Sequence, residues 1–502
     1  MIKKKITAMF FCYRLIDFRL LLTSGIFKNC SNIMRIVVIV PKSSFKECKK
    51  ILPKDIIIRI LNHKIAKQEN YKASQKTKLE NFLRNILSLT YANNRNYKKC
   101  LSPEPQRSAF FNSESSKGLI KKLSSMLAIF LSFIGSNFFF VRKFIQFLIF
   151  FLLKNSSHKE LYEEFKPDII IVGSMGLDAD AKVIWEAKNN KVKTLVINQS
   201  WDRTVCKGYP VIHPDYHLVW NDHMKFESMY YLDMPKNSIF IEGAAIWDYI
   251  FKKDGLRDKY SFFSAMNLDI SKKTVYYPLT PLFWHDELLK NLDQFKLAKI
   301  SKKISNKIQI IFRVHPYYWI APEKIRNQLF SKLKKLEDIE GFFVDYNKVI
   351  GTQDSYILKP EDQEFLVNVY HHSDICISVL SSSMMEMIFC GKPSINYVFG
   401  KLKMRGQEIQ AKDYLLHHIN HLYSFNVIKN VHVFNDIIDE LNNIDNCSID
   451  KKLQEKVINS EISYNRGTAS KAYANRILSL AKLKKIIIKF YFFIKYFPMG
   501  SF

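Results

Sequence analysis

Three consecutive serines, Ser381, Ser382 and Ser383, separate the apolar run DICISVL from the stretch MMEMIFC. If a helix begins here, its first-turn N–H groups and the serine hydroxyls can donate hydrogen bonds to one anion, which the helix dipole also favours. Glu386 lies one turn further along, where its carboxylate could accept hydrogen bonds from a ribose diol. The same residues also match a capping box, Ser383-x-x-Glu386, in which the carboxylate only bonds back to the backbone. Taken alone, the stretch favours the capping box, because capping boxes are common helix starts.

Two further loops follow strand-like apolar runs in the second half of the chain. Thr280 lies in VYYPLTP, and Arg313 and His315 lie in IIFRVHP. The Arg313 guanidinium could pair with a diphosphate or with a carboxylate of the fold. A proline follows His315 and fixes it at the strand end, where a histidine is as often a structural residue as a ligand or an acid.

A fourth loop ends the run TLVINQSWD in the first half of the chain, and Lys207 follows it. The carboxylate of Asp202 could act as a general base if it faces a cleft, or it could form a local Asx-turn. The indole of Trp201 could stack on a sugar or a base, or it could close the core. Both readings remain open for each residue.

The composition restricts the class of protein. A length of 502 residues predicts two domains, because one hydrophobic core rarely grows so large. The net charge of +29 suits an anionic lipid surface or a nucleotide phosphate, and no nucleic-acid-binding motif is present, so we expect no nucleic-acid partner. The eight cysteines are scattered without a C-x-x-C pair, which predicts neither a disulfide framework nor a metal site and favours a reducing cytosol.

Strand-like and helix-like runs alternate along most of the chain. The first strand expected is RIVVIVP, and a regular alternation runs from PDIIIVGS onward, which predicts parallel sheets with crossover helices. Ligands of such sheets bind beyond the carboxyl ends of the strands, where the four loops lie. The predicted division is a 1–33 N-terminal extension, a 34–255 first lobe, a 256–272 linker, a 273–480 second lobe and a 481–502 basic, apolar tail.

Residues 119–154 form an apolar and basic insertion in the first lobe. The stretch from Leu123 to Val141 carries no charge, and Arg142 and Lys143 separate it from a second apolar run. A helix lying in a membrane interface, with its lysine and arginine at the headgroups, fits this pattern best. A buried pair of core helices is the second interpretation, and a membrane span is the third.

The order and spacing of six stretches resemble the surface-carbohydrate glycosyltransferases of the GT-B fold. These stretches are NQSWDRTVCKG, DYHLVWND, IFIEGAAIWDYIF, IIFRVHP, SVLSSSMMEMIFCGKPSINY and TASKAYANRI. More broadly, they resemble a superfamily that also holds CDP-glycerol glycerophosphotransferases and UDP-N-acetylglucosamine 2-epimerases. The resemblance covers about residues 167–480 and implies an α/β fold of two doubly wound, Rossmann-like lobes.

The resemblance implies a nucleotide-sugar donor site in the second lobe. There His315 would contact the donor phosphates, Ser381–Ser383 would hold the diphosphate, and Glu386 would bind the ribose. Thr280 and Arg313 complete the expected donor-side residues, with Arg313 stabilising the departing anion. Asp202, as catalytic base, would lie on the acceptor side with Trp201 and Lys207.

The expected activity is transfer of a sugar from a nucleotide sugar to a bacterial cell-surface glycan, such as capsule or lipopolysaccharide, or to a lipid-linked acceptor. The His-Gly pair of the glycerophosphotransferases is missing near Trp201, which favours sugar transfer. No D-x-D stands at a strand end, so we expect a metal-independent reaction without a cofactor. We expect a cytoplasmic protein, peripheral on the inner face of the cytoplasmic membrane. The alternatives are a CDP-polyol phosphotransferase, a nucleotide-sugar epimerase and a non-catalytic, membrane-associated assembly protein.

Overall fold

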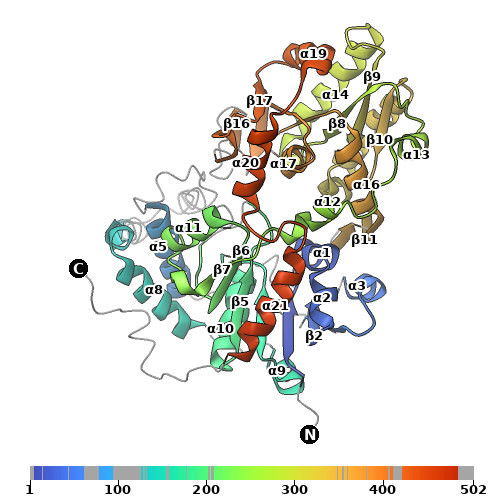
Figure 1. Cartoon of the computed structure of the whole chain (residues 1–502). Coiled ribbons are helices and arrows are strands. Elements are labelled where there is room, and N and C mark those ends of the chain that lie inside the picture. The colour runs from blue at the N-terminus through green and yellow to red at the C-terminus, as the bar shows by residue number, and fades with distance from the viewer. Residues whose placement is uncertain are drawn as a thin grey trace. The chain divides into compact units, whose positions relative to one another are not determined.

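The computed structural model divides into two compact units, each built on one parallel sheet (Figure 1). Unit 1 comprises Met1–Ala245 and Ser463–Phe502, and unit 2 comprises Ile246–Ile462. The residues that the structure describes are 5–13, 15–42, 44–61, 78–93, 126–127, 130–131, 133–153, 158–176, 178–201, 204, 209–347, 349–352, 355–358, 360–379, 381–404, 407–410 and 421–483.

The sheet of unit 1 has seven parallel strands in the order β3-β2-β1-β4-β5-β6-β7. Its inner strands are short runs of apolar and β-branched residues that are buried on both faces, as is usual where helices cover a parallel sheet. The strands are β1 (Thr7–Phe11), β2 (Arg35–Val40), β3 (Ile57–Ile60), β4 (Ile169–Val172), β5 (Lys193–Ile197), β6 (Tyr216–Val219) and β7 (Ile239–Ile241).

The prediction that residues 1–33 form an extension is wrong. Residues Thr7–Phe11 form β1, which pairs with β2 on one side and with β4 on the other, so it lies inside the sheet. Asp17 and Arg19, which interrupt the apolar sequence after the strand, belong to α1 (Leu15–Thr23), a separate helix. A five-residue strand beside a charged helix gives a weaker sequence signal than the longer run of β2, although β1 is buried along its whole length.

The described helices of unit 1 surround this sheet. They are α1 (Leu15–Thr23), α2 (Ile26–Ser31), α3 (Phe45–Ile51), α5 (Lys78–Asn93), α8 (Phe139–Leu152), α9 (Lys159–Phe165), α10 (Asp178–Asn189), α11 (Asp222–Tyr230) and α21 (Ala469–Lys482), with the 3-10 turn η4 (Lys236–Ser238). Figure 1 shows α21 lying along the unit 1 sheet, where it contacts α2 and β4.

The predicted lobe boundaries differ from the observed units. The chain passes into unit 2 at Ile246, and the expected linker at 256–272 instead contains α13 (Lys259–Ser264), which packs on α16 (Pro360–His372) of unit 2. The chain returns to unit 1 at Ser463, so α21 does not belong to the second lobe. The ammonium of Lys193 at the start of β5 donates to the carbonyls of Leu480 and Ala481, at 3.0 and 2.8 Å, and so caps the end of α21.

The sheet of unit 2 has six parallel strands in the order β10-β9-β8-β13-β14-β17. They are β8 (Lys273–Pro278), β9 (Ile308–Arg313), β10 (Phe342–Asp345), β13 (Ile375–Ser378), β14 (Ser394–Tyr397) and β17 (Ile428–Val431). Two antiparallel pairs stand apart from the sheet, β11 (Val349–Thr352) with β12 (Ser355–Leu358) and β15 (Lys401–Met404) with β16 (Gln407–Gln410).

Unit 2, as far as the structure describes it, has an aromatic core in which Tyr277, Phe295 and Phe312 meet edge to face. Its described helices are α12 (Asp248–Lys252), α13, α14 (His285–Ile300), α15 (Glu323–Glu337), α16 (Pro360–His372), α17 (Ser382–Phe389), α19 (Phe434–Asn442) and α20 (Lys451–Glu461). The 3-10 turns are η5 (Ala245–Trp247), η6 (Leu282–Trp284), η7 (Pro316–Ile320) and η9 (Ile444–Asn446).

Both sheets share the strand order of the Rossmann fold, and the expected fold class of two doubly wound, Rossmann-like units is confirmed. The order of connection reverses between β1 and β4 in unit 1 and between β8 and β13 in unit 2. Ligands of doubly wound sheets bind at this switch point, beyond the carboxyl ends of the strands. Among the described residues, no helix combines the length and the apolar composition needed to cross a bilayer.

Candidate active site

The serine-rich helix start lies at the switch point of unit 2. Strand β13 ends at Ser378, and α17 begins at Ser382 with Ser381 as its N-cap residue. The Ser381 hydroxyl does not cap the helix; it shares a hydrogen bond with the Ser378 hydroxyl at 2.8 Å. Ser382 is exposed and Ser383 is half-buried. The first turn of α17 therefore presents backbone N–H groups and hydroxyls at the position where doubly wound sheets bind phosphates.

Thr280 follows β8, the neighbour of β13 in the sheet, so the structure brings it to the same edge. The loop is held by a backbone hydrogen bond of 2.8 Å from Leu279 N–H to the Arg313 carbonyl. Thr280 is itself buried, so it lies beneath this edge and not on its surface. Its predicted contact with a donor stays a prediction.

Arg313 pairs with carboxylates of the fold, the second of the two roles considered from the sequence. Its guanidinium is buried at the end of β9, and it forms ion pairs with Asp345 of β10 and Asp362 of α16. Burial alone would lower the pKa of this guanidinium, yet the two carboxylates raise it well above its ordinary value. We therefore assign Arg313 a structural role that joins two strands and a helix, in place of a direct contact with a diphosphate.

His315 remains a candidate ligand residue. It is the N-cap of η7, and its Nδ1 accepts a hydrogen bond of 3.2 Å from the Tyr317 backbone N–H. Because Nδ1 is the acceptor, the neutral ring carries its proton on Nε2, which is then a donor. The ring is only half-buried and stands two residues beyond the end of β9, at the same edge as the α17 start.

Glu386 does not form the capping box that the sequence suggested. Since α17 begins at Ser382, Glu386 is the fifth residue of the helix and lies on its buried face. Its carboxylate accepts a hydrogen bond of 3.1 Å from Trp247 Nε1 and another from the Tyr370 hydroxyl. Burial and this carboxylate together raise the pKa of Tyr370 well above its ordinary value, so the phenol keeps the proton that it donates.

A Glu386→Ala substitution is expected to lower the free energy of unfolding of unit 2 by about 2 to 4 kcal/mol, because it removes the carboxylate that accepts from two buried donors. Glu386→Gln is expected to cost about 1 kcal/mol, because the amide oxygen still accepts from Trp247 while the Tyr370 hydroxyl turns to accept from the amide. Hydrogen exchange of α17 peptides in the intact chain measures both. Equal losses in the two variants would contradict the observed hydrogen bonding.

The acceptor-side residues are only partly described. Trp201 is half-buried beyond the end of β5, whereas Asp202 and Lys207 lie outside the described residues. The loops at this edge are tightly packed, since a Cβ on Gly173 would stand 1.6 Å from the Gln199 Nε2 atom. The Asn198 amide donates to the Ser200 carbonyl at 2.8 Å, which fixes the backbone that leads to Trp201.

The sequence interpretation missed the partners that hold the site in place. Trp247 and Tyr370 position Glu386, and Asp345 and Asp362 neutralise Arg313. Only Asp345 carried a usable signal, because it ends the strand FFVD next to the strand that ends in Arg313. The other three belong to helices or to a 3-10 turn, and their sequence context shows no relation to the residues they contact.

Solved structures match this chain in fold, although no protein-family model and no curated protein sequence matches it. A candidate UDP-N-acetylglucosamine 2-epimerase from Listeria monocytogenes is 10% identical, with 95% of each chain covered and a TM-score of 0.51. The UDP-GlcNAc 2-epimerase of Neisseria meningitidis is 13% identical over 95% of this chain and all (100%) of that chain, with a TM-score of 0.48. The glycotransferase of kitacinnamycin is 9% identical over 95% of this chain and 100% of that chain, with a TM-score of 0.46. The Listeria match agrees with the strand orders in showing a GT-B-like pair of Rossmann units.

Proposed function

We propose that this chain is a GT-B-type glycosyltransferase that binds a nucleotide-sugar donor at the switch point of unit 2. The observation that carries this proposal is the start of α17 directly beyond β13, with Ser382 exposed on its first turn. A helix start offers unpaired N–H groups and a partial positive charge, which together stabilise a diphosphate. His315 supports the site with a second donor at the same edge.

In the proposed reaction the acceptor hydroxyl oxygen attacks the anomeric carbon of the donor sugar. The bond from that carbon to the diphosphate oxygen breaks, and its electron pair leaves with the nucleoside diphosphate. The N–H groups of the α17 start and the hydroxyls of Ser381–Ser383 stabilise the charge that develops there. The proton of the acceptor passes to a carboxylate, for which Asp202 is our candidate. Glu386 is the candidate ribose ligand, and no step requires a metal ion or a cofactor.

A nucleotide-sugar epimerase is the second candidate function. The Listeria structure, which is described as a candidate epimerase, favours this function. Its TM-score is the highest of the three structures named for comparison. Both reactions need the same nucleotide-binding edge in unit 2, and they differ in whether a second substrate enters. The acceptor that we propose is a cell-surface glycan or a lipid-linked intermediate at the inner face of the cytoplasmic membrane.

Product analysis distinguishes the two reactions. The purified chain is incubated with UDP-, GDP- or CDP-linked sugars, with and without a bacterial lipid extract, and the products are separated by mass spectrometry and chromatography. A transferase releases nucleoside diphosphate and requires the extract. An epimerase changes the configuration of the nucleotide sugar without the lipid extract. That result would show that the chain is an epimerase and not a transferase. If no nucleotide sugar binds, both candidates are wrong.

A further inference from the structure

Helix α8 of unit 1 buries all of its polar residues and exposes several phenylalanines to solvent. Its outward residues Phe140, Phe144 and Phe151 are 51%, 52% and 62% exposed. They are four and seven positions apart, so they lie along one side of the helix. The polar residues of this helix, Arg142, Lys143 and Gln146, are all buried.

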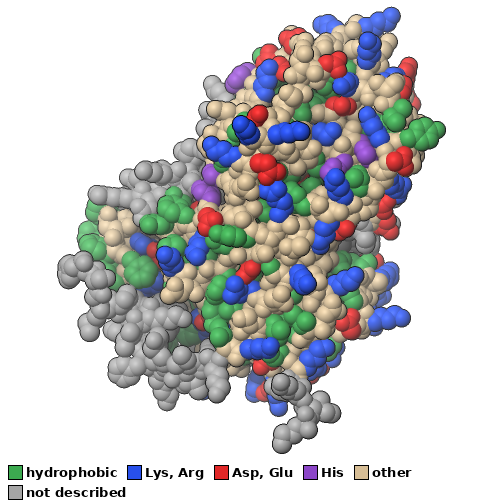
Figure 2. Space-filling model, in the orientation of Figure 1, with side chains coloured by type: hydrophobic (Ala, Val, Ile, Leu, Met, Phe, Trp, Pro, Cys, Tyr) green, Lys and Arg blue, Asp and Glu red, His purple; other side chains and the backbone are tan. Residues whose placement is uncertain are grey.

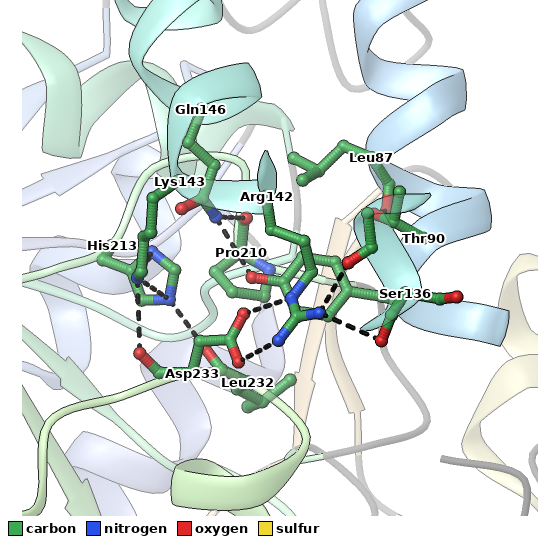
Figure 3. A network of polar contacts seen from close by, with 12 residues as sticks. Leu87, Thr90, Ser136, Arg142, Lys143, Gln146, Pro210, His213, Leu232 and Asp233 are labelled. Atoms are coloured by element: carbon green, nitrogen blue, oxygen red, sulfur yellow. Dashed lines mark hydrogen bonds and ion pairs between the residues drawn. The ribbon is translucent and has the colours of Figure 1, made fainter. Parts of the chain in front are cut away.

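Arg142 is held by an ion pair inside unit 1 (Figure 3). Its Nε and Nη2 atoms donate to the two carboxylate oxygens of Asp233 at 2.6 and 2.8 Å. Its Nη1 atom donates to the Gly135 carbonyl at 2.7 Å, which ties α8 to the chain just before it. Gly135 itself lies so close to α5 that a Cβ there would stand 2.4 Å from the Thr90 side chain.

Lys143 and Gln146 have inward partners as well, as Figure 3 shows. The His213 Nε2 atom lies 2.6 Å from the Leu232 carbonyl and therefore carries the ring proton, which leaves Nδ1 to accept from the Lys143 ammonium or amine at 3.1 Å. The Gln146 amide donates to the Pro210 carbonyl at 2.6 Å. Each polar side chain of α8 is thus matched to a specific group beneath the helix.

The stability of unit 1 is expected to rise with pH from about 7 to about 10.5. Burial lowers the pKa of Lys143 from 10.5 to about 7, an effect that Asp233 opposes and that Arg142 and Lys188 reinforce. Within this window the unfolded chain holds the Lys143 proton and the folded chain releases it. The free energy of unfolding therefore increases as the pH rises. Lys143→Met is expected to flatten this dependence, measured by hydrogen exchange of α8 peptides; a slope equal to that of the wild type would contradict it.

These contacts correct the expectation that Arg142 and Lys143 lie at lipid headgroups. Both are inside unit 1, because Asp233 and His213 supply partners there. Turning α8 over to hide its phenylalanines would bring a buried arginine out and leave the Asp233 carboxylate unpaired, which is strongly unfavourable. The outward position of the phenylalanines is therefore enforced by the fold.

The segment before α8 also exposes phenylalanines, and the ring centroid of Phe138 lies 5.4 Å from that of Phe140. Phe130, Phe133 and Phe138 are 60%, 67% and 50% exposed. Figure 2 shows hydrophobic side chains gathered on the part of unit 1 where Figure 1 draws α8. We call these six residues the phenylalanine face: Phe130, Phe133, Phe138, Phe140, Phe144 and Phe151. Exposed apolar surface of this kind marks an interaction site.

We propose that the phenylalanine face inserts into the headgroup and upper acyl region of an anionic membrane. Phenylalanine offers no hydrogen-bond donor or acceptor, whereas protein interfaces contain about one hydrogen bond per 100–200 Å². Hydrocarbon requires no such partners, so it fits this face better than a protein surface does. At 14 residues, α8 is shorter than a bilayer span and suits a helix lying in the interface.

Charge complementarity identifies the lipid as anionic. The chain has a net charge of +29, and lysines flank the phenylalanine face in the sequence, with Lys121 and Lys122 before it and Lys154 and Lys159 after it. Basic residues beside an inserted helix are attracted to anionic lipid. This inference does not depend on the proposed reaction, because the phenylalanine face belongs to unit 1 and the proposed donor site to unit 2.

Vesicle flotation of the full chain tests the proposal. The wild type is expected to float with vesicles of phosphatidylcholine and phosphatidylglycerol and to float less with phosphatidylcholine alone. A Phe140→Ser/Phe144→Ser variant is expected to partition at least about tenfold more weakly, because two apolar side chains no longer leave water. The matched control is Leu297→Ser/Ile300→Ser, which removes two exposed apolar side chains from α14 of unit 2 and is expected to float like the wild type. Circular dichroism confirms that both variants are folded.

Three results would overturn the proposal. The first is that the wild type floats with neither kind of vesicle. Such a result combined with light scattering that shows a dimer would assign the phenylalanine face to a contact with a second copy of the chain. The second is a Phe140→Ser/Phe144→Ser variant that floats like the wild type. The third is binding that survives these substitutions and is lost when residues 484–502 are removed, since this would assign the membrane contact to the tail.

Discussion

A Ser382→Glu variant is expected to bind nucleoside diphosphates at least about 100-fold more weakly than the wild type while remaining at least as stable. The new carboxylate would stand on the first turn of α17, where the proposed diphosphate lies, and would repel it. The same carboxylate interacts favourably with the helix dipole, so the helix itself is not weakened. Ligand affinity and stability thus change in opposite directions, which separates a binding effect from a folding defect.

Two control variants accompany Ser382→Glu: one removes only the serine hydroxyl, and the other places a carboxylate at the start of a different helix. Ser382→Ala keeps the backbone N–H groups and is expected to weaken binding by less than about tenfold, the loss of one hydrogen bond. Lys451→Glu places a carboxylate on the exposed first residue of α20 in the same unit and is expected to leave affinity unchanged. Titration calorimetry measures all three variants. Wild-type affinity in Ser382→Glu would show that the ligand does not bind at this helix start.

An Arg313→Met variant is expected to lose about 3 to 5 kcal/mol of the free energy of unfolding of unit 2 at neutral pH. The substitution leaves the carboxylates of Asp345 and Asp362 buried without their cation. Even with Arg313 present, burial raises the pKa of Asp345, so its charge depends on this partner. Without the partner the folded state favours the protonated acid more strongly still, and acidification is expected to recover part of the loss.

Hydrogen exchange of peptides from β9, β10 and α16 measures the effect in the intact chain. The matched control is Arg313→Met with Asp345→Asn and Asp362→Asn, which removes all three charges and is expected to recover much of the stability. If Arg313→Met proves as stable as the wild type and has lost its affinity for nucleoside diphosphates, the guanidinium binds the ligand, as the sequence first suggested.

The fold could largely be predicted because the strands of a parallel sheet appear in the sequence as short apolar runs. The parallel strands from Arg35 to Tyr397 and the doubly wound class follow from this pattern, whereas β17 has a single buried residue and was not predicted. The strand Thr7–Phe11 could not be recognised, because its position inside the sheet depends on pairing with β4, which lies more than a hundred residues later. That α21 belongs to unit 1 could not be predicted either, because its tertiary contacts with α2 and β4 determine this position.

The start of α17 could be predicted better than the surroundings of its residues. Ser381 and Ser382 stand where the sequence placed them, because a strand end followed by a polar helix start is a local pattern. The environment of Glu386 depends on Trp247, which is 139 positions away in the chain. The orientation of α8 depends on Asp233, 91 positions from Arg142. Local patterns carry no information about such distant partners.

Calorimetric titration of the intact chain with UDP, GDP and CDP, and with the corresponding nucleotide sugars, tests the donor site most directly. We expect saturable binding of at least one of them at a single site, together with loss of that binding in Ser382→Glu. A chain that is fully folded and yields only heats of dilution with every one of these ligands would contradict the proposal.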